Sequence, residues 1–354
     1  MSKNPFIGLR PYKTSENESF HGREKEVESI LSIIQKNKLV FLTGPSGSGK
    51  TSIINAGIIP RLRNGFTGQS GSRWSICKFR PGISPVSNLS FSLSNGELVL
   101  DKKPQTNDFR NYRNTILEIQ DLSIGKIYKD SEISNKKNLL IIIDQLEDLF
   151  IFKNLVKNDE LSEDVLLLNI VSRTIRLFDC SVYFLISLKT EFLKTLSSYT
   201  NIQQILTNSQ YPIQNIGADG ILKIVNKTFT RQNIIIDNSL LEDIINKTTR
   251  NIGLLPNLQV MFQSFFESFE SPSTITIENS SKIGDIDNVI NKKLNIFHDN
   301  LNENDQIFFE CLIKSLFNIE NSDIYSDFRS IKEILDCTDK SHKYFDDFFK
   351  KLRD

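Results

Sequence analysis

One stretch, residues 38–51, constrains the fold of this chain more than any other. A short apolar run, Lys38-Leu39-Val40-Phe41-Leu42-Thr43, leads into the glycine-rich turn Gly44-Pro45-Ser46-Gly47-Ser48-Gly49-Lys50-Thr51. The turn matches the pattern G-x-x-x-x-G-K-[ST], and its flanks are typical of the strand and the helix that this pattern requires. A serine–glycine linker that happens to end in Lys-Thr is the alternative, and these flanks make it the weaker interpretation.

The residue types of this turn suit a phosphate group. Gly47 and Gly49 let the backbone curl so that its N–H groups face phosphate oxygens without a Cβ clash. The N-terminus of the following helix adds partial positive charge. Lys50 can then reach the β- and γ-phosphates, and the Thr51 hydroxyl can bind Mg²⁺. We therefore predict a site for ATP or ADP with Mg²⁺, and its phosphate-binding residues are Pro45, Ser46, Gly47, Ser48, Gly49, Lys50, Thr51 and Ser52.

Composition excludes several other classes of protein. Of 354 residues, 39% are hydrophobic and 24% charged, which is ordinary for a globular protein. Basic and acidic residues balance at 43 each, so nucleic acid is not the expected ligand, although a local basic face stays open. The four cysteines and three histidines are scattered, which argues against zinc and favours buried, reduced thiols. Without a signal core or a membrane-length apolar run, we expect a soluble, cytoplasmic protein.

Apolar periodicity predicts strands that alternate with helices up to about residue 216. The expected strands are 38–43, 74–79, 139–143 and 182–188, and the expected helices start at Glu24, span 49–59 with Pro60 at the end, and carry Leu168 to Phe178. Residues 84–137 are polar, so we expect loop or insertion there, apart from one helix around 112–122. This alternation predicts an α/β fold with a doubly wound parallel sheet, whose ligands bind at the carboxyl ends of the strands.

After residue 216 the signals for strands stop. We expect helices at 219–231, 238–249, 254–269, 286–298 and 304–317, then an apolar stripe at Phe345, Phe348, Phe349 and Leu352. Because the chain stops at Asp354 directly after this stripe, we expect that the natural protein continues.

Four side chains near strand ends are candidates for the rest of the site. Asp144 closes an apolar strand roughly 90 residues after the turn, where P-loop enzymes place an aspartate that binds Mg²⁺; a strand-ending aspartate in a turn is the alternative. Hydrolysis also needs a carboxylate that activates water. Gln145 stands where many ATPases have Glu, so Glu147 and Asp148 are the nearest candidates and the base stays open. Lys189 is either a sensor of the γ-phosphate or an exposed turn lysine.

Several stretches together resemble one family, the novel STAND NTPases, bacterial relatives of the AAA+ and NLR-type switch ATPases. Besides the glycine-rich turn, the matching pieces are Asn4 to Tyr12, Phe20-His21-Gly22-Arg23-Glu24, Ile58 to Leu62, Ile143 to Phe150, Leu188 to Leu193, and Gly253 to Gln259. Order and spacing agree across nearly the whole chain.

The resemblance implies more than spacing does. It implies an N-terminal nucleotide-contacting arm (1–23), a P-loop NTPase domain (24–216), a helical lid (217–271) and a winged-helix-like domain (272–354). Gly22 and Arg23 would line the adenine side, and Pro256 would contact nucleotide from the lid. The family usually has Arg in place of Lys189 and a Glu pair in place of Glu147-Asp148, which leaves the hydrolytic residue open.

Three functions compete at this point. The resemblance favours a switch in bacterial signalling or defence that exchanges ADP for ATP, hydrolyses ATP slowly and self-associates, with its sensor region or partner outside this chain. The first alternative is an ATP-regulated DNA-binding protein, but Asp327 to Ile334, where a winged helix would need basic residues, is mixed in charge. The second is a constitutive ATPase with a merely structural lid.

Overall fold

The computed structural model of this chain consists of two compact units, residues 1–280 and 281–354, each described here by itself. Within them the structure describes residues 4–65, 73–95, 98, 106–153, 162–177, 179–214, 216–231, 235–237, 239–240, 242, 254–268, 274–275, 286–320, 323–326, 335, 341, 343–345 and 347–348. The glycine-rich turn lies in the first unit.

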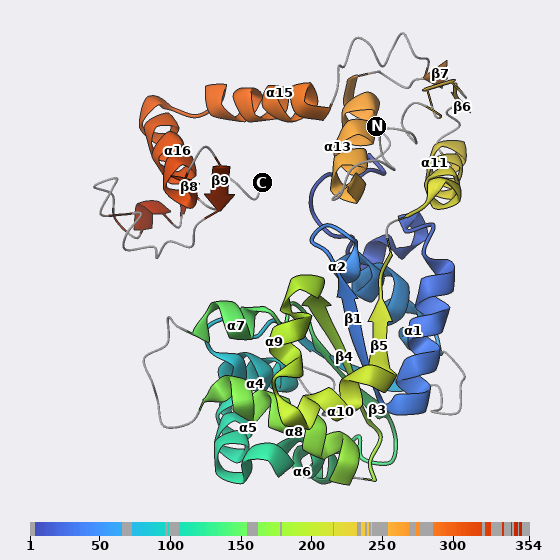
Figure 1. Ribbon diagram of the computed structural model, residues 1–354, viewed down its shortest axis with the longest axis vertical. Helices are drawn as coiled ribbons and strands as arrows, with labels where there is room; N and C mark the ends of the chain where they lie inside the picture. The colour runs from blue at the N-terminus through green and yellow to red at the C-terminus, as the bar shows by residue number, and fades with distance from the viewer. Residues whose placement is uncertain are drawn as a thin grey trace. The chain divides into compact units, whose positions relative to one another are not determined.

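The first unit is built on a five-stranded sheet in which all neighbouring strands are parallel (Figure 1). The strands lie in the order β2-β3-β4-β1-β5, and they are β1 (Leu39–Gly44), β2 (Trp74–Phe79), β3 (Asn138–Ile143), β4 (Val182–Lys189) and β5 (Gln210–Pro212). Every residue of β1 and β3 is buried, as expected for strands covered on both faces.

Helices cover both faces of this sheet. In β1, Leu39 and Phe41 belong to one buried cluster, while Val40 and Leu42 belong to another, because successive strand residues point to opposite faces. The second cluster takes in α1 (Glu24–Asn37) and the helix after the glycine-rich turn. The first takes in α4 (Pro85–Asn95), α5 (Thr106–Ile119), α6 (Ser123–Asp130), α8 (Glu163–Leu177), α9 (Leu193–Ser197) and α10 (Thr200–Ser209). The predicted doubly wound α/β sheet is therefore confirmed.

The first strand in spatial order carries the tryptophan of this chain. Trp74 opens β2 and is buried in the second cluster, with its ring centroid 4.9 Å from that of Tyr183 in β4. The pair therefore packs in the core on one face of the sheet, across β3, which lies between β2 and β4.

The helix after the glycine-rich turn is longer than predicted. It runs as α2 (Lys50–Ser52), a π-helical segment η2 (Ile53–Ile58) and α3 (Ile59–Arg63). The predicted end at Pro60 is wrong. Pro60 lies in the first turn of α3, after the π-helical segment, and a helix tolerates a missing N–H in its first turn.

The expectation of loop between residues 84 and 137 is also wrong. This stretch holds α4, α5, the short 3₁₀ turn η3 (Gln120–Leu122) and α6, and only the part around residues 112–122 was predicted as helix. α4 is rich in serine, but Ser90 Oγ donates to the Val86 carbonyl at 2.7 Å and Ser94 Oγ to the Phe91 carbonyl at 2.9 Å. Because these hydroxyls bond to the helix itself, the serines can be buried beside Leu89.

The remaining elements of the first unit include the proposed lid. They are η1 (Thr14–Ser19), α7 (Asp148–Ile151), η5 (Thr190–Phe192), α11 (Ala218–Arg231), α13 (Leu254–Ser268), β6 (Ile235–Ile236) and β7 (Thr274–Ile275). Strands β6 and β7 pair in parallel, so the expectation of no strand after residue 216 is wrong. The helix predicted at 238–249 falls largely outside the described residues, as does Phe178.

The N-terminal arm packs against both lid helices. Phe6 is buried, and its ring centroid lies 5.2 Å from that of Phe229 in α11 and 5.1 Å from that of Phe262 in α13. The two lid rings are themselves 5.4 Å apart. The arm therefore holds two helices together that are distant in the sequence.

Among the described residues of the second unit are the helices α15 (Ile286–Asp299) and α16 (Glu303–Leu316) and the hairpin of β8 (Phe317–Glu320) and β9 (Asp323–Ser326). Phe308 of α16 packs with Phe345 and Phe348, which are the described part of the predicted apolar stripe. The antiparallel pair β8–β9 is a second departure from the expectation of helices alone.

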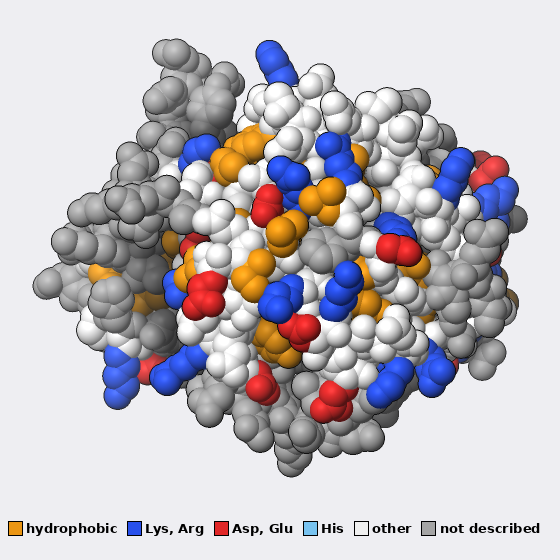
Figure 2. Space-filling view, turned by 90° about the horizontal axis from the view of Figure 1, so that it is seen from below, with side chains coloured by type: hydrophobic (Ala, Val, Ile, Leu, Met, Phe, Trp, Pro, Cys, Tyr) orange, Lys and Arg blue, Asp and Glu red, His pale blue; other side chains and the backbone are white. Residues whose placement is uncertain are grey.

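The surface charges, the apolar character of the helices and the thiols give three further observations. On the face shown in Figure 2, basic and acidic side chains are interspersed. No helix among the described residues is both long and apolar enough to cross a bilayer. Cys77 and Cys180 are buried and form no disulfide among the described residues, while Cys311 is partly exposed, contrary to prediction, and Cys337 lies outside the described residues.

Candidate nucleotide-binding site

A cavity of about 570 Å³ lies where the strands of the first unit end. Its walls come from the arm before α1, the glycine-rich turn and the start of the helix after it, the residues at the strand ends, and helices α11 and α13. Residues that line it include Tyr12, Ser46, Lys50, Asp144, Ile224 and Pro256.

The glycine-rich turn has the backbone that only glycine adopts readily. Gly47 and Gly49 have φ angles of +74° and +90°, in the left-handed region. A Cβ on Gly44 would lie 2.8 Å from the hydroxyl of Ser48, so the turn is closely packed as well. The Ser48 hydroxyl is buried without a hydrogen-bond partner in the described part of the chain. A buried, unsatisfied hydroxyl inside a phosphate-sized turn fits an anionic ligand.

Lys50 is folded back onto this turn. Its ammonium group donates to the carbonyl oxygens of Gly44 at 2.7 Å and Pro45 at 2.8 Å. Burial lowers the pKa of Lys50 from its ordinary value, and the nearby Glu147 carboxylate opposes that shift. A buried ammonium group favours a ligand that brings negative charge, as phosphate does.

Asp144 follows β3 directly and is buried. Its Oδ1 accepts hydrogen bonds from Thr51 Oγ1 at 3.2 Å and from Ser187 Oγ at 2.7 Å. Its Oδ2 lies 3.0 Å from Lys78 Nζ. The structure thus places the two predicted metal ligands side by side, and hydroxyl and carboxylate oxygens are the ligands that Mg²⁺ prefers.

The two candidate catalytic carboxylates face different surroundings. Glu147 lines the cavity, and its Oε2 accepts a hydrogen bond from the Lys189 backbone N–H at 3.2 Å. Asp148 lines a separate hollow, where its Oδ2 lies 3.5 Å from Arg80 Nε and accepts from the Gly82 N–H at 3.4 Å. Burial raises the pKa of both carboxyl groups, and for Asp148 the charge of Arg80 opposes the shift. Glu147 is therefore the better placed to meet a ligand.

Gln145 and Lys189 also line the cavity. Gln145 has φ +65°, a left-handed conformation that is uncommon for residues other than glycine, and its N–H donates to Ser187 Oγ at 2.8 Å. Lys189 is half-buried, with Nζ 4.0 Å from Glu191 Oε1. Ser187 thus holds both Asp144 and the backbone that follows it.

Arg23 lies at the side of the cavity formed by the start of α1. It is only 3% exposed; its guanidinium pairs with Glu26 at 2.7 Å and donates to the Ser48 carbonyl at 3.3 Å. Arg23 Nε and His21 Nε2 are buried polar atoms without a hydrogen-bond partner among the described residues. Burial lowers the pKa of His21, which favours the neutral ring.

Helices α11 and α13, which lie in the stretch predicted as a lid, also reach the site. Gly22 has φ +87°, and a Cβ there would lie 2.9 Å from Ile224 Cγ1 of α11. A Cβ on Gly49 would lie 3.5 Å from Leu255 Cδ1 of α13, so α13 contacts the glycine-rich turn itself. Pro256, the next residue of α13, lines the cavity.

The arm joins the turn's helix to the lid through Tyr12. The Tyr12 N–H donates to Ser52 Oγ at 3.3 Å, and Asn55 Nδ2 donates to the Tyr12 carbonyl at 2.9 Å. Gln259 Nε2 of α13 donates to the Tyr12 hydroxyl at 3.2 Å, and Gln259 Oε1 accepts from the Ile7 N–H at 3.1 Å. One arm therefore contacts both sides of the cavity.

Most of the predicted site residues meet at this one cavity. It is lined by Arg23, Ser46, Gly47, Ser48, Gly49, Lys50, Thr51, Ser52, Asp144, Glu147, Lys189 and Pro256. Gly22 packs against α11, Pro45 accepts from Lys50, and Asp148 faces Arg80.

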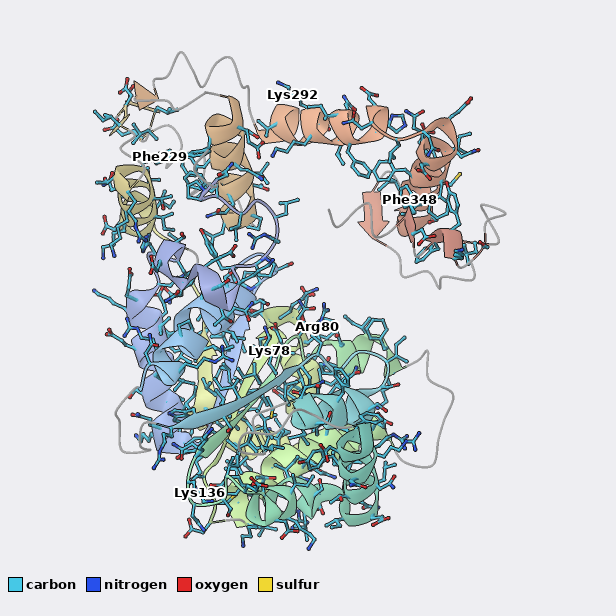
Figure 3. The ribbon with its side chains drawn as sticks, turned by 180° about the vertical axis from the view of Figure 1, so that it is seen from behind. Lys78, Arg80, Lys136, Phe229, Lys292 and Phe348 are labelled. Atoms are coloured by element: carbon cyan, nitrogen blue, oxygen red, sulfur yellow. The ribbon has the colours of Figure 1, made fainter. Side chains whose placement is uncertain are left out.

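Sequence reasoning missed Lys78, Arg80, Ser187 and Gln259. The rule that ligands sit at strand ends could have found the first two, because β2 ends at Phe79 between them (Figure 3).

The parallel sheet and the glycine-rich turn between β1 and α2 define this chain as a P-loop NTPase. The sequence model of the family described as Novel STAND NTPase 1 matches residues 5–353. The chain belongs to the novel STAND NTPase family, as the resemblance predicted.

Two solved structures share this fold. The structure of Drosophila ORC bound to DNA is 10% identical, with 95% of this chain and 79% of that chain covered and a TM-score of 0.50. The Aeropyrum pernix ORC2 protein, solved in ADPNP–ADP complexes, is 12% identical, with 99% and 89% covered and a TM-score of 0.50. At such identities the likeness shows the fold alone. Among curated proteins, none matches this chain.

Proposed function

We propose that this P-loop NTPase is a switch that binds ATP or ADP with Mg²⁺, exchanges ADP for ATP on a signal, and hydrolyses ATP slowly. The observation that carries the proposal is the make-up of the cavity, whose walls come from the glycine-rich turn, the arm and the lid together. A nucleotide in this cavity would contact all three at once, so its phosphates would affect how the lid and the arm close. That coupling is what a switch requires.

Specific residues support binding of the phosphates and the metal. The backbone of residues 45–49 and the ammonium of Lys50 would hold the phosphates, while Thr51 and Asp144 would hold Mg²⁺. The metal would supply positive charge at the phosphate oxygens. Arg23 and Gly22 lie toward α1 and α11, where the family resemblance places the adenine side.

Slow hydrolysis follows from the surroundings of Glu147. This buried carboxylate is the proposed group that activates water, and its raised pKa suits a base. However, Glu147 is separated from Asp144 by two residues and accepts the Lys189 N–H, so one of its oxygens is already engaged. A base that is partly occupied, next to a lysine in place of the family's arginine, favours slow turnover.

The domains after the NTPase domain and the cellular role are proposed from the family resemblance and from the elements of the second unit. We propose residues 217–271 as the lid and residues 272–354 as a winged-helix-like domain, with α15, α16 and the hairpin β8–β9 as its described parts. From the family resemblance we also propose that the protein self-associates and acts in bacterial signalling or defence. Its sensor region or partner would lie outside this chain.

The nucleotide content of the freshly purified protein tests the proposal. We expect near-stoichiometric ADP in the supernatant of the denatured parent protein, measured by chromatography, and its loss in Lys50→Ala. A parent protein that carries no nucleotide but turns ATP over at several per second would identify a constitutive ATPase instead. No nucleotide and no binding of added ATP would refute the nucleotide site itself.

Limited proteolysis tests the lid. If Pro256 and Gln259 meet the nucleotide, cleavage between about residues 210 and 280 should slow when ADP or ATP is added. Equal cleavage with and without nucleotide would remove the lid from the proposal.

A further inference from the structure

Lys78 is a positively charged residue of the cavity that has no role in the nucleotide binding proposed above. It lies in β2, one residue before the end of the strand, and its side chain is 27% exposed and lines the cavity. Its ammonium lies 3.0 Å from Asp144 Oδ2 and donates to Asn55 Oδ1 at 2.6 Å. Figure 3 labels Lys78 and Arg80 at the upper end of the sheet, and Lys136 at its lower end.

The contacts of Asp144 divide into two kinds. Its Oδ1 accepts two neutral hydroxyls, from Thr51 and Ser187, while its Oδ2 pairs with the charged ammonium of Lys78. An ionised carboxylate this deeply buried is costly unless a cation compensates it. Lys78 supplies that compensation from within the chain.

The position of this charge bears on metal binding. A Mg²⁺ ion held by Thr51 and Asp144 would share one carboxylate with the Lys78 ammonium, and two cations beside one carboxylate disfavour each other. The same ammonium is also a positive charge at the phosphate end of the cavity, where a metal-free nucleotide needs one.

Asn55 fixes where the ammonium sits. Its Oδ1 accepts from Lys78, while its Nδ2 donates to the Tyr12 carbonyl, so both ends of the amide are engaged. Lys78 is therefore held at Asp144 by the arm and the turn's helix, and is not free to swing into solvent as an ordinary surface lysine does.

We propose that Lys78 is a positioning residue that lowers the dependence of nucleotide binding on Mg²⁺, because it competes with the metal at Asp144 and attracts metal-free nucleotide. The inference rests on the proposed binding of nucleotide. Such a role would favour retention of ADP, because ADP binds the metal with one phosphate fewer than ATP does.

The test compares the Kd of a fluorescent ADP analogue in Mg²⁺ with its Kd in EDTA, in the full chain. We expect the ratio of Kd in EDTA to Kd in Mg²⁺ to rise about tenfold in Lys78→Met relative to the parent. Lys78→Arg keeps the charge and should restore a ratio within about threefold of the parent. Lys136→Met removes a lysine at the other end of the sheet and should leave the ratio unchanged.

A ratio that does not rise in Lys78→Met, or that rises equally in Lys78→Arg, overturns the proposal. If Lys78→Met does not fold, Lys78→Gln and Asn55→Ala replace it, and an unchanged ratio in both has the same meaning. A parent that binds the analogue neither with Mg²⁺ nor with EDTA ends the proposed function and this inference together. A parent that binds, with an unmoved ratio in the variants, ends only the role of Lys78.

Discussion

The two walls of the cavity are held in different ways. At the strand-end wall, Asp144 accepts hydrogen bonds of 2.7 and 3.2 Å from Ser187 and Thr51. Ser187 lies in β4, Asp144 directly follows β3, and Thr51 lies in α2. At the arm–lid wall, three phenylalanine rings and a few hydrogen bonds connect residues more than 200 positions apart. The first wall is part of the sheet's core, whereas the second consists mainly of contacts between the arm, α11 and α13.

This difference suits a switch. Opening the arm–lid wall exposes a small aromatic cluster, and the exposed pairs Lys227–Glu24 and Arg231–Glu18 add little to its stability. Opening the strand-end wall would break the sheet. If the proposed switch is correct, we expect the arm and the lid to move and the phosphate side to stay in place.

The largest effect should come from Phe6→Ala. Removing this buried ring costs about 3–5 kcal/mol at the site, because it leaves a cavity between α11 and α13. We expect faster hydrogen exchange in these two helices and unchanged exchange in β1 and β3. Phe91→Ala is the matched control, since Phe91 is 62% exposed. Loss of protection throughout the sheet would show that the two walls are not independent.

Lys50→Ala should act on the other wall alone. Each charge-assisted hydrogen bond to a phosphate is worth about 1.5–3 kcal/mol, so the affinity for ATP should fall roughly hundredfold. Cleavage of the arm and the lid without nucleotide should match the parent. Titration with a fluorescent ATP analogue and limited proteolysis measure the two effects, and retained affinity would contradict the assignment of Lys50.

Gly22→Ala should weaken the junction of α1 with the lid. The residue has φ +87°, and the added Cβ would lie 2.9 Å from Ile224 Cγ1, so we expect a cost of about 1–3 kcal/mol. Gly217→Ala is the control, because a Cβ there meets nothing within 4 Å. Thermal unfolding of both variants measures the difference, and equal midpoints would argue against this close contact.

Glu147→Gln should give the smallest effect, and one that depends on pH. The folded-state pKa of Glu147 is raised, so the folded protein binds more protons than the unfolded chain between the two pKa values. Stability contributed by this group therefore falls as the pH rises from the unfolded value toward the folded one. We expect the variant to melt above the parent at pH 7.5 and close to it at pH 4.5. A gain in melting temperature that is larger at pH 4.5 than at pH 7.5 would contradict the raised pKa of Glu147.

The parts of the fold and the site that could be predicted from the sequence are those formed by residues close together in the chain. The turn at residues 44–51 and strands β1, β3 and β4 were predicted because local residue types determine them. α4 was missed because its serines satisfy their own hydroxyls within the helix, which polarity alone does not reveal.

The contacts of the arm–lid wall could not be predicted from the sequence. Ile7 meets Gln259, and Phe6 meets Phe262, across some 250 residues, and no periodicity links such positions. The family resemblance supplied Gly22, Arg23 and Pro256 where spacing could not. Lys78 and Ser187 were passed over because, within a strand pattern, they look like ordinary members of β2 and β4.

The place of the tryptophan makes the two walls separately visible. This chain has a single tryptophan, Trp74, and it is packed against Tyr183 inside the sheet. Its intrinsic emission will therefore follow the melting of the sheet, whereas departure of the arm or the lid leaves the ring's packing intact. A protein whose lid has opened would look fully native by this optical signal and yet be readily cut by protease. The difference between those two signals is a label-free readout of the proposed switch.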